Sequence, residues 1–220
     1  EVNTLSENLR VWNHPTLTVI LLPFVSRIDI SPTCTAVSGG PTPLICGSGT
    51  SGGNGIGAIE KITYRSLPID IIGIPPSQGW VFTYENFARS NALTNITSPA
   101  TYGITLTAKM FAHGNGVGCT DNSPSFLQAP YFVSCAGTPF SYNMNAVDND
   151  LDSLHIDFGI PYNNFPTGAY NPPLNPIPIP FEPGFSFTSP TPNSGVNPSN
   201  IPASINPSNG EITFNSFTVG

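Results

Sequence analysis

The most concentrated set of potential metal ligands in this sequence comprises Asp148, Asp150 and Asp152. Three carboxylates at alternating positions can turn several oxygen atoms toward one hard cation, and oxygen is the donor that Ca²⁺ prefers. Asp121 and Asp157 could add ligands if the fold brings them near. The alternative is a solvated acidic turn whose side chains accept hydrogen bonds from the local backbone. The spacing predicts a calcium site at the three aspartates, with the acidic turn as the competing interpretation.

The other residues with reactive side chains are isolated from one another. None of His14, His113 and His155 lies at metal-binding spacing from another His or from a Cys. Residues 49–53 read Gly-Thr-Ser-Gly-Gly and match a nucleophile motif by letter, but no strand precedes them and no helix follows, as that motif requires. Because no base-activated nucleophile or paired carboxylate can be nominated, we predict that the protein is not an enzyme.

Four cysteines are present, at Cys34, Cys46, Cys119 and Cys135. Proximity in the sequence favours the disulfides Cys34–Cys46 and Cys119–Cys135, each of which would close a Gly- and Pro-rich loop. The alternative is four free thiols in a reduced compartment. No Cys-x-x-Cys motif occurs, so zinc or thioredoxin-like chemistry has no support. We predict disulfides and an extracellular location.

Composition and charge exclude several classes of partner. Charged residues make up 9% of the chain, against about 25% in an average domain. The net charge is −7 with six basic residues, too few for a phosphate-neutralising surface, so we predict no nucleic-acid partner. The longest apolar run, residues 17–25, is interrupted by Pro23 and is too short to span a membrane.

Apolar runs of strand length recur between turn signals, and the runs at 79–84 and 103–108 alternate apolar and polar residues. The segment 85–93 could be a two-turn helix or strand and loop. We expect an all-β fold: two tandem immunoglobulin-like or cadherin-like β-sandwich domains, 1–120 and 121–220, with long Pro/Gly-rich loops. The runs expected to form strands are 9–12, 17–23, 26–30, 59–66, 69–72, 80–84, 102–112, 131–135, 140–143, 155–158, 185–188, 203–205 and 211–214.

Proline and glycine punctuate these runs. Residues 38–57 are expected to be a surface loop, and residues 161–207 hold 13 of the 25 prolines. Within them, residues 172–180 should adopt polyproline II without ladder hydrogen bonds. Asn-Gly pairs at 54–55, 115–116 and 209–210 supply the positive φ that tight hairpin turns need.

Four aromatic residues on the expected strands suggest a second function. Trp80, Tyr84, Tyr102 and Phe111 could form a platform that stacks against sugar rings, or they could be buried in the core. The first interpretation predicts a carbohydrate-binding β-sandwich module and is the alternative to a structural role.

Several segments in order resemble the large cell-surface proteins of gliding and related Bacteroidota, which carry gliding-motility-associated C-terminal regions and are exported by type IX secretion. The segments that carry the resemblance are Lys61-Ile62-Thr63-Tyr64-Arg65-Ser66, Gly79-Trp80-Val81-Phe82-Thr83-Tyr84, Arg89-Ser90-Asn91-Ala92-Leu93-Thr94-Asn95-Ile96, Cys119 with Asn122-Ser123-Pro124-Ser125-Phe126, Ala146-Val147-Asp148-Asn149-Asp150-Leu151-Asp152-Ser153-Leu154, and Ile205-Asn206-Pro207-Ser208-Asn209-Gly210-Glu211-Ile212-Thr213-Phe214. Where this chain has Phe87 and Ala88, similar proteins often have a Cys pair, so a disulfide there is absent.

The resemblance implies a non-enzymatic structural or adhesive module of a secreted surface protein, such as a gliding adhesin or a surface filament. Its partners would be other copies or neighbouring modules of a surface assembly, or surface polysaccharide. It also implies that the first domain lacks its first strands and the second its last strand. Asp152-Ser153-Leu154 resembles the O-glycosylation triplet of such proteins, which marks Ser153 as a modification site. The sequon at Asn95 would matter only in a eukaryote.

Overall fold

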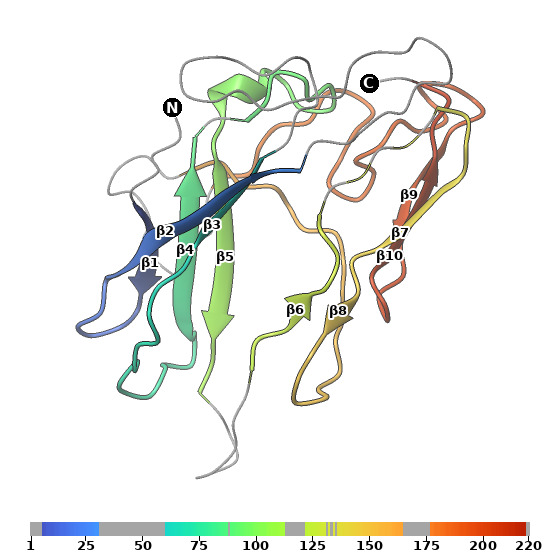
Figure 1. The fold of residues 1–220 in the computed structure, drawn as a ribbon. Helices are drawn as coiled ribbons and strands as arrows, with labels where there is room; N and C mark the ends of the chain where they lie inside the picture. The colour runs from blue at the N-terminus through green and yellow to red at the C-terminus, as the bar shows by residue number, and fades with distance from the viewer. Residues whose placement is uncertain are drawn as a thin grey trace. The chain divides into compact units, whose positions relative to one another are not determined.

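The computed structural model describes residues 6–30, 60–87, 89–112, 122–130, 132, 134, 136–164 and 177–218. Its regular elements are almost all antiparallel strands, and these residues contain no α-helix, so the predicted all-β class is confirmed (Figure 1). Residues 85–93 therefore follow the strand-and-loop alternative where they are described. The elements are β1 (Ser6–Trp12), β2 (Val19–Asp29), β3 (Glu60–Tyr64), β4 (Trp80–Asn86), the 3₁₀ turn η1 (Pro99–Thr101), β5 (Ile104–Met110), β6 (Ser125–Phe126), β7 (Phe140–Asn143), β8 (Ala146–Val147), β9 (Ile201–Ile205) and β10 (Glu211–Asn215).

The chain divides into two compact units. Unit 1 comprises Glu1–Tyr84 and Ala108–Met110, and unit 2 comprises Glu85–Thr107 and Phe111–Gly220. The boundary expected after residue 120 lies inside unit 2. Two tandem sandwich domains therefore remain a prediction.

The largest sheet has the order β3-β2-β1-β4-β5, and its strands β1, β2, β3 and most of β4 belong to unit 1. The alternation of apolar and polar residues places Val11, Ile20 and Trp80 on one face, where all three are buried. Val81 and Thr83 are buried on the opposite face, and Thr83 Oγ1 accepts a hydrogen bond from Trp12 Nε1 at 2.9 Å. Both faces of β4 are therefore covered, which explains why its sequence is apolar at successive positions.

Unit 2 contains a three-stranded sheet, β7-β10-β9, whose faces differ in chemistry. Phe140 and Tyr142 lie on one face together with Phe214, which pairs with Phe140 across the ladder, while Ser141 and Thr213 lie on the other. The Asn-Gly turn expected at 209–210 joins β9 to β10, with Gly210 at φ 73°, so this hairpin prediction is confirmed. A separate two-stranded sheet pairs β6 with β8.

The described end of the proline-rich segment, residues 177–182, pairs like a strand. The Asn163 N–H donates to the Ile177 carbonyl at 3.0 Å, and the Ile179 N–H donates to Pro161 at 3.1 Å. Further along, Thr97 donates to the Pro180 carbonyl at 3.2 Å. The expectation that residues 172–180 make no ladder hydrogen bonds is wrong for this part. Residues along a strand point their N–H groups to alternate edges, so prolines at every second position leave the donors on the other edge intact.

Candidate functional site: an acidic turn beside an apolar hollow

The predicted calcium ligands lie in a tight turn after β8. The Asp148 carboxylate accepts hydrogen bonds from the backbone N–H of Asp150 at 2.8 Å and of Asp152 at 3.4 Å. Leu151 between them adopts a positive φ of 65° and donates its N–H to the Asp148 carbonyl. These are the bonds that an aspartate makes when it organises its own turn.

A second carboxylate of this turn reaches a distant segment. Asp150 accepts hydrogen bonds from the backbone N–H of Asn122 and from its side-chain Nδ2, the latter at 3.0 and 3.1 Å. Because Asn122 precedes β6 and Asp150 follows β8, this contact closes the loop ends beside the two-stranded sheet. Asp150 therefore fastens the turn to the segment before β6.

The described residues contain no group of three or more His, Cys, Asp or Glu side chains positioned to hold a metal ion. Asp148 and Asp150 direct oxygens at backbone donors, as the acidic-turn interpretation expected. Asp157 lines the neighbouring hollow, and Asp121 lies outside the described residues. Calcium binding by Asp148, Asp150 and Asp152 stays a prediction.

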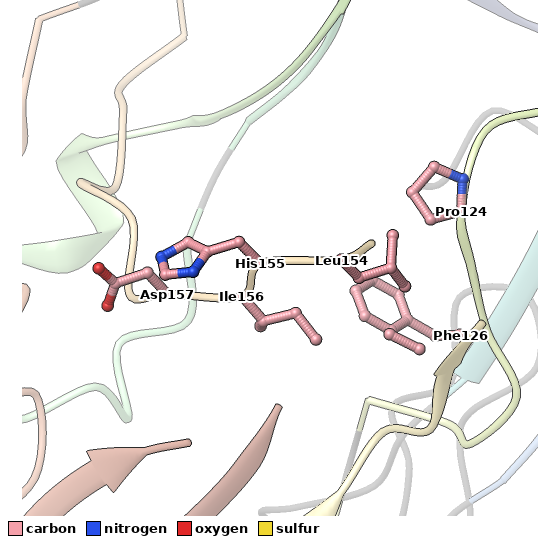
Figure 2. A pocket seen from close by; sticks show the side chains of 7 residues that line it. Pro124, Phe126, Leu154, His155, Ile156 and Asp157 are labelled. Atoms are coloured by element: carbon pink, nitrogen blue, oxygen red, sulfur yellow. The ribbon is translucent and has the colours of Figure 1, made fainter. Parts of the chain in front are cut away.

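An apolar hollow of about 270 Å³ lies next to this turn in the sequence and in space. Its lining residues are Pro124, Phe126, Ala146, Leu154, His155, Ile156 and Asp157 (Figure 2). In Figure 2 the His155 and Asp157 side chains extend away from the Phe126 ring. The apolar part of the lining thus comes from Pro124, β6, β8, Leu154 and Ile156, and the imidazole of His155 and the carboxylate of Asp157 point away from the Phe126 ring.

The segment that contributes Leu154 and Ile156 has the side-chain alternation of a strand without a ladder. Leu154, Ile156 and Phe158 are half-buried, whereas His155 and Asp157 are exposed. Its one backbone hydrogen bond among the described residues runs from the Ile156 N–H to the Pro207 carbonyl at 3.0 Å. The strand expected at 155–158 is therefore not formed, because a single hydrogen bond does not make a ladder.

Polar residues that were not singled out in the sequence hold together another part of unit 2. Arg89 Nε donates to the Gly103 carbonyl at 2.9 Å, and the guanidinium Nη2 donates to the backbone carbonyl of Tyr162 at 3.1 Å. Asn163 Oδ1 accepts the Gly103 N–H at 2.7 Å. Burial lowers the pKa of Arg89, although an arginine stays charged. No spacing rule could have found these residues because their partners are backbone groups up to 73 positions away.

Gly103 is the point where these contacts meet. A Cβ atom there would lie 2.5 Å from both Asn164 Oδ1 and the Asn86 carbonyl oxygen. Only glycine allows the segments to approach this closely.

The aromatic residues proposed to bind sugar have different environments. Trp80 is 2% exposed and packs against the His14 ring at a centroid distance of 4.7 Å, so it is a core residue. Tyr84 and Tyr102 are half-buried, and Phe111 is exposed.

A different aromatic cluster covers the apolar face of the β7-β10-β9 sheet. Phe132, which is 45% exposed, packs in a tilted arrangement against Phe140 and Tyr142, at ring-centroid distances of 4.4 and 5.3 Å.

Other predicted residues are less informative. The four cysteines, His113 and residues 49–53 lie outside the described residues, so the disulfides Cys34–Cys46 and Cys119–Cys135 stay predictions. Ser153 is exposed and could be modified. Asn95, in the sequon, donates its Nδ2 to the Pro190 carbonyl at 2.8 Å.

Comparison of the chain with protein-family models, curated proteins and solved structures found no match. Within the described ranges, no helix has the length and hydrophobicity needed to cross a bilayer. The functional conclusion therefore rests on the residues and their geometry.

Proposed function

We propose that this chain is a non-enzymatic structural or adhesive module of a large secreted bacterial cell-surface protein. The observation that carries the proposal is the use of its polar side chains. Polar side chains form hydrogen bonds with backbone groups and thereby hold loops to one another. These side chains are Asp148, Asp150, Arg89 and Asn163. Because these side chains stabilise loops, their use favours a structural role for the module.

A sheet surface with exposed apolar side chains supports the adhesive part of the proposal. Val19 and Leu21 lie on one face of β2, Val25 lies where the register shifts between Phe24 and Ser26, and each is about half exposed. The β1 residues that pair with Leu21 and Val19 are the polar Asn8 and Arg10. Exposed apolar patches on a protein surface often mark sites of contact with a partner.

The test is retention of the purified chain on apolar, glass and polysaccharide-coated surfaces under flow. A variant with Val19→Thr, Leu21→Thr and Val25→Thr removes apolar area but keeps residues suited to strands. We expect the variant to be retained several-fold less than the native chain on an apolar surface, with unchanged thermal stability. Its matched control carries Leu67→Thr, Ile72→Thr and Ile74→Thr, which are also exposed but lie outside any strand.

Equal retention of both variants and the native chain would remove the adhesive function from β2. Turnover of any surface polymer by the native chain would overturn the non-enzymatic role itself.

Carbohydrate binding is a second candidate, favoured by the partly exposed aromatic face of unit 2. The Phe132 ring is 45% exposed above Phe140 and could accept a sugar ring on its outer face. A glycan array distinguishes the candidates, because binding that is lost in Phe132→Ala and kept in the exposed control Phe87→Ala would favour this one.

A further inference from the structure

The segment that joins β3 to β4 is secured to the β1–β2 turn by a histidine. We call residues 66–78 of this segment the strap. It carries the exposed side chains of Leu67, Ile72 and Ile74 and contains no strand. His14 Nε2 and the Ile72 carbonyl oxygen lie 3.1 Å apart, and a second hydrogen bond runs from Asn13 Nδ2 in the turn to the carbonyl of Gly79, directly after the strap, at 3.3 Å.

The hydrogen bonds of His14 define which nitrogen carries the proton. Nδ1 faces the backbone N–H groups of Thr16 at 3.2 Å and Leu17 at 2.8 Å. A nitrogen that accepts from two donors cannot carry a proton itself, so the ring is neutral and its proton is on Nε2. Nε2 then donates to Ile72. The same neutral ring therefore both shapes the turn and holds the strap.

Elsewhere this chain builds the same kind of turn with residues that do not titrate near neutral pH. An acceptor side chain receives the N–H of the residue two positions ahead at Asn143, Asn193, Asn197, Asn206 and Asn209. Histidine is the side chain whose ordinary titration falls between pH 5 and 8. A histidine acceptor is removed when the ring gains a second proton, whereas an asparagine acceptor is not.

A hollow lies between the turn and the strap. The turn contributes His14, Thr16 and Leu17 to its lining, and the strap contributes Ile69, Asp70, Ile71 and Ile72. Among the described residues that line the hollow at His14, Asp70 is the one other titratable group. The uncharged Trp80 ring also packs against His14. The Asp70 carboxylate cannot replace the acceptor that Thr16 and Leu17 lose when Nδ1 carries a proton.

We propose that His14 is a pH-sensitive fastener of the strap. Protonation of Nδ1 places a donor opposite two backbone donors, so the ring turns away and the β1–β2 turn opens. The hydrogen bond to Ile72 is lost with the same movement. The strap and its exposed apolar side chains are then free to move in acid while the sheet of unit 1 stays folded.

The test is amide hydrogen exchange of Thr16, Leu17 and strap residues as a function of pH. His14→Asn is the matched variant, because an asparagine supplies an oxygen acceptor as in the turns above and does not titrate. Dividing the native rate by the variant rate at the same pH removes the intrinsic pH dependence of exchange. We expect this ratio to rise about tenfold at Thr16 and Leu17 between pH 8 and about pH 5.

A ratio that stays constant across this range would overturn the proposal. If His14→Asn does not fold, the ¹⁵N spectrum of the native His14 ring decides instead. A neutral ring with its proton on Nε2 at pH 8, which gains a proton as Thr16 and Leu17 lose protection, supports the fastener. A proton on Nδ1 at pH 8 would overturn it. Exchange in β4 residues should stay slow throughout, which separates strap release from global unfolding.

Discussion

Two regions of this molecule reach order by different physical routes. The sheet of unit 1 buries Val11, Ile20 and Trp80 on strands whose side chains alternate. In unit 2, the pairing of residues 161–163 with the proline-rich residues 177–179 instead depends on Arg89, Asn163 and the backbone groups of Gly103. The first region gains its stability from apolar burial and the second from satisfying buried polar groups. A low-charge chain rich in Pro, Asn and Ser can therefore build defined structure without a large apolar core in every part.

The largest effect should come from the core of unit 1. Trp80→Ala should lower the free energy of unfolding by about 3–5 kcal/mol, because it removes a large side chain that is 2% exposed. Chemical denaturation followed by circular dichroism measures the loss. Ile72→Ala, which truncates an exposed residue of the strap, should change it by less than about 0.5 kcal/mol. Equal effects would mean that burial does not order this sheet.

The next effect should appear in the ladder of unit 2. Asn163→Ala leaves the buried Gly103 N–H without its acceptor and should cost about 1–3 kcal/mol. Asn163→Asp keeps an oxygen in place and should cost clearly less. Hydrogen exchange at Gly103 and Thr105 measures the local change. Unaltered protection in Asn163→Ala would show that the polar contacts do not hold this region.

A smaller effect should separate the two interpretations of the acidic turn. Asp148→Ala removes the acceptor for the N–H groups of Asp150 and Asp152 and should destabilise the chain by about 1 kcal/mol, whereas Asp148→Asn should be nearly neutral. Both are compared by thermal unfolding with calcium and with a chelator. Stabilisation by calcium that Asp148→Asn abolishes would establish the metal site.

The smallest effect concerns Tyr64 on the edge strand β3. Burial and the nearby Glu7 carboxylate raise the pKa of Tyr64 above 10.0. The unfolded chain therefore ionises this phenol at lower pH than the folded chain, so its contribution to stability is lost as pH rises above about 10. The unfolding temperature of the native chain should fall more steeply between about pH 9 and 11 than that of Tyr64→Phe. Parallel curves would contradict this assignment.

The sequence predicts the regions in which short-range patterns decide the structure. The strand-length runs at 79–84 and 103–108 give β4 and β5, and Asn209-Gly210 gives the hairpin between β9 and β10. Runs at 69–72 and 155–158 have similar composition and form no strand. Strand formation needs a partner as well as a pattern, and the partner is fixed by contacts far apart in the sequence.

The candidate site illustrates the same limit. The run of aspartates is visible in the sequence, but their use as turn acceptors depends on where the Asp150 and Asp152 N–H groups point. The contact of Asp150 with Asn122 spans 28 positions and has no local signal. His14 was visible only as an isolated histidine, and its role follows from three backbone groups that the fold brings to one ring.

The proposed function is tested most directly by sedimentation of the native protein released from the surface of intact cells by gentle shear. We predict that the chain is recovered in this surface fraction within a species much heavier than its own 23.2 kDa. That result would place it in an extracellular assembly, as a structural or adhesive module requires. Recovery inside the cells, or release only as a 23.2 kDa monomer, would contradict the account.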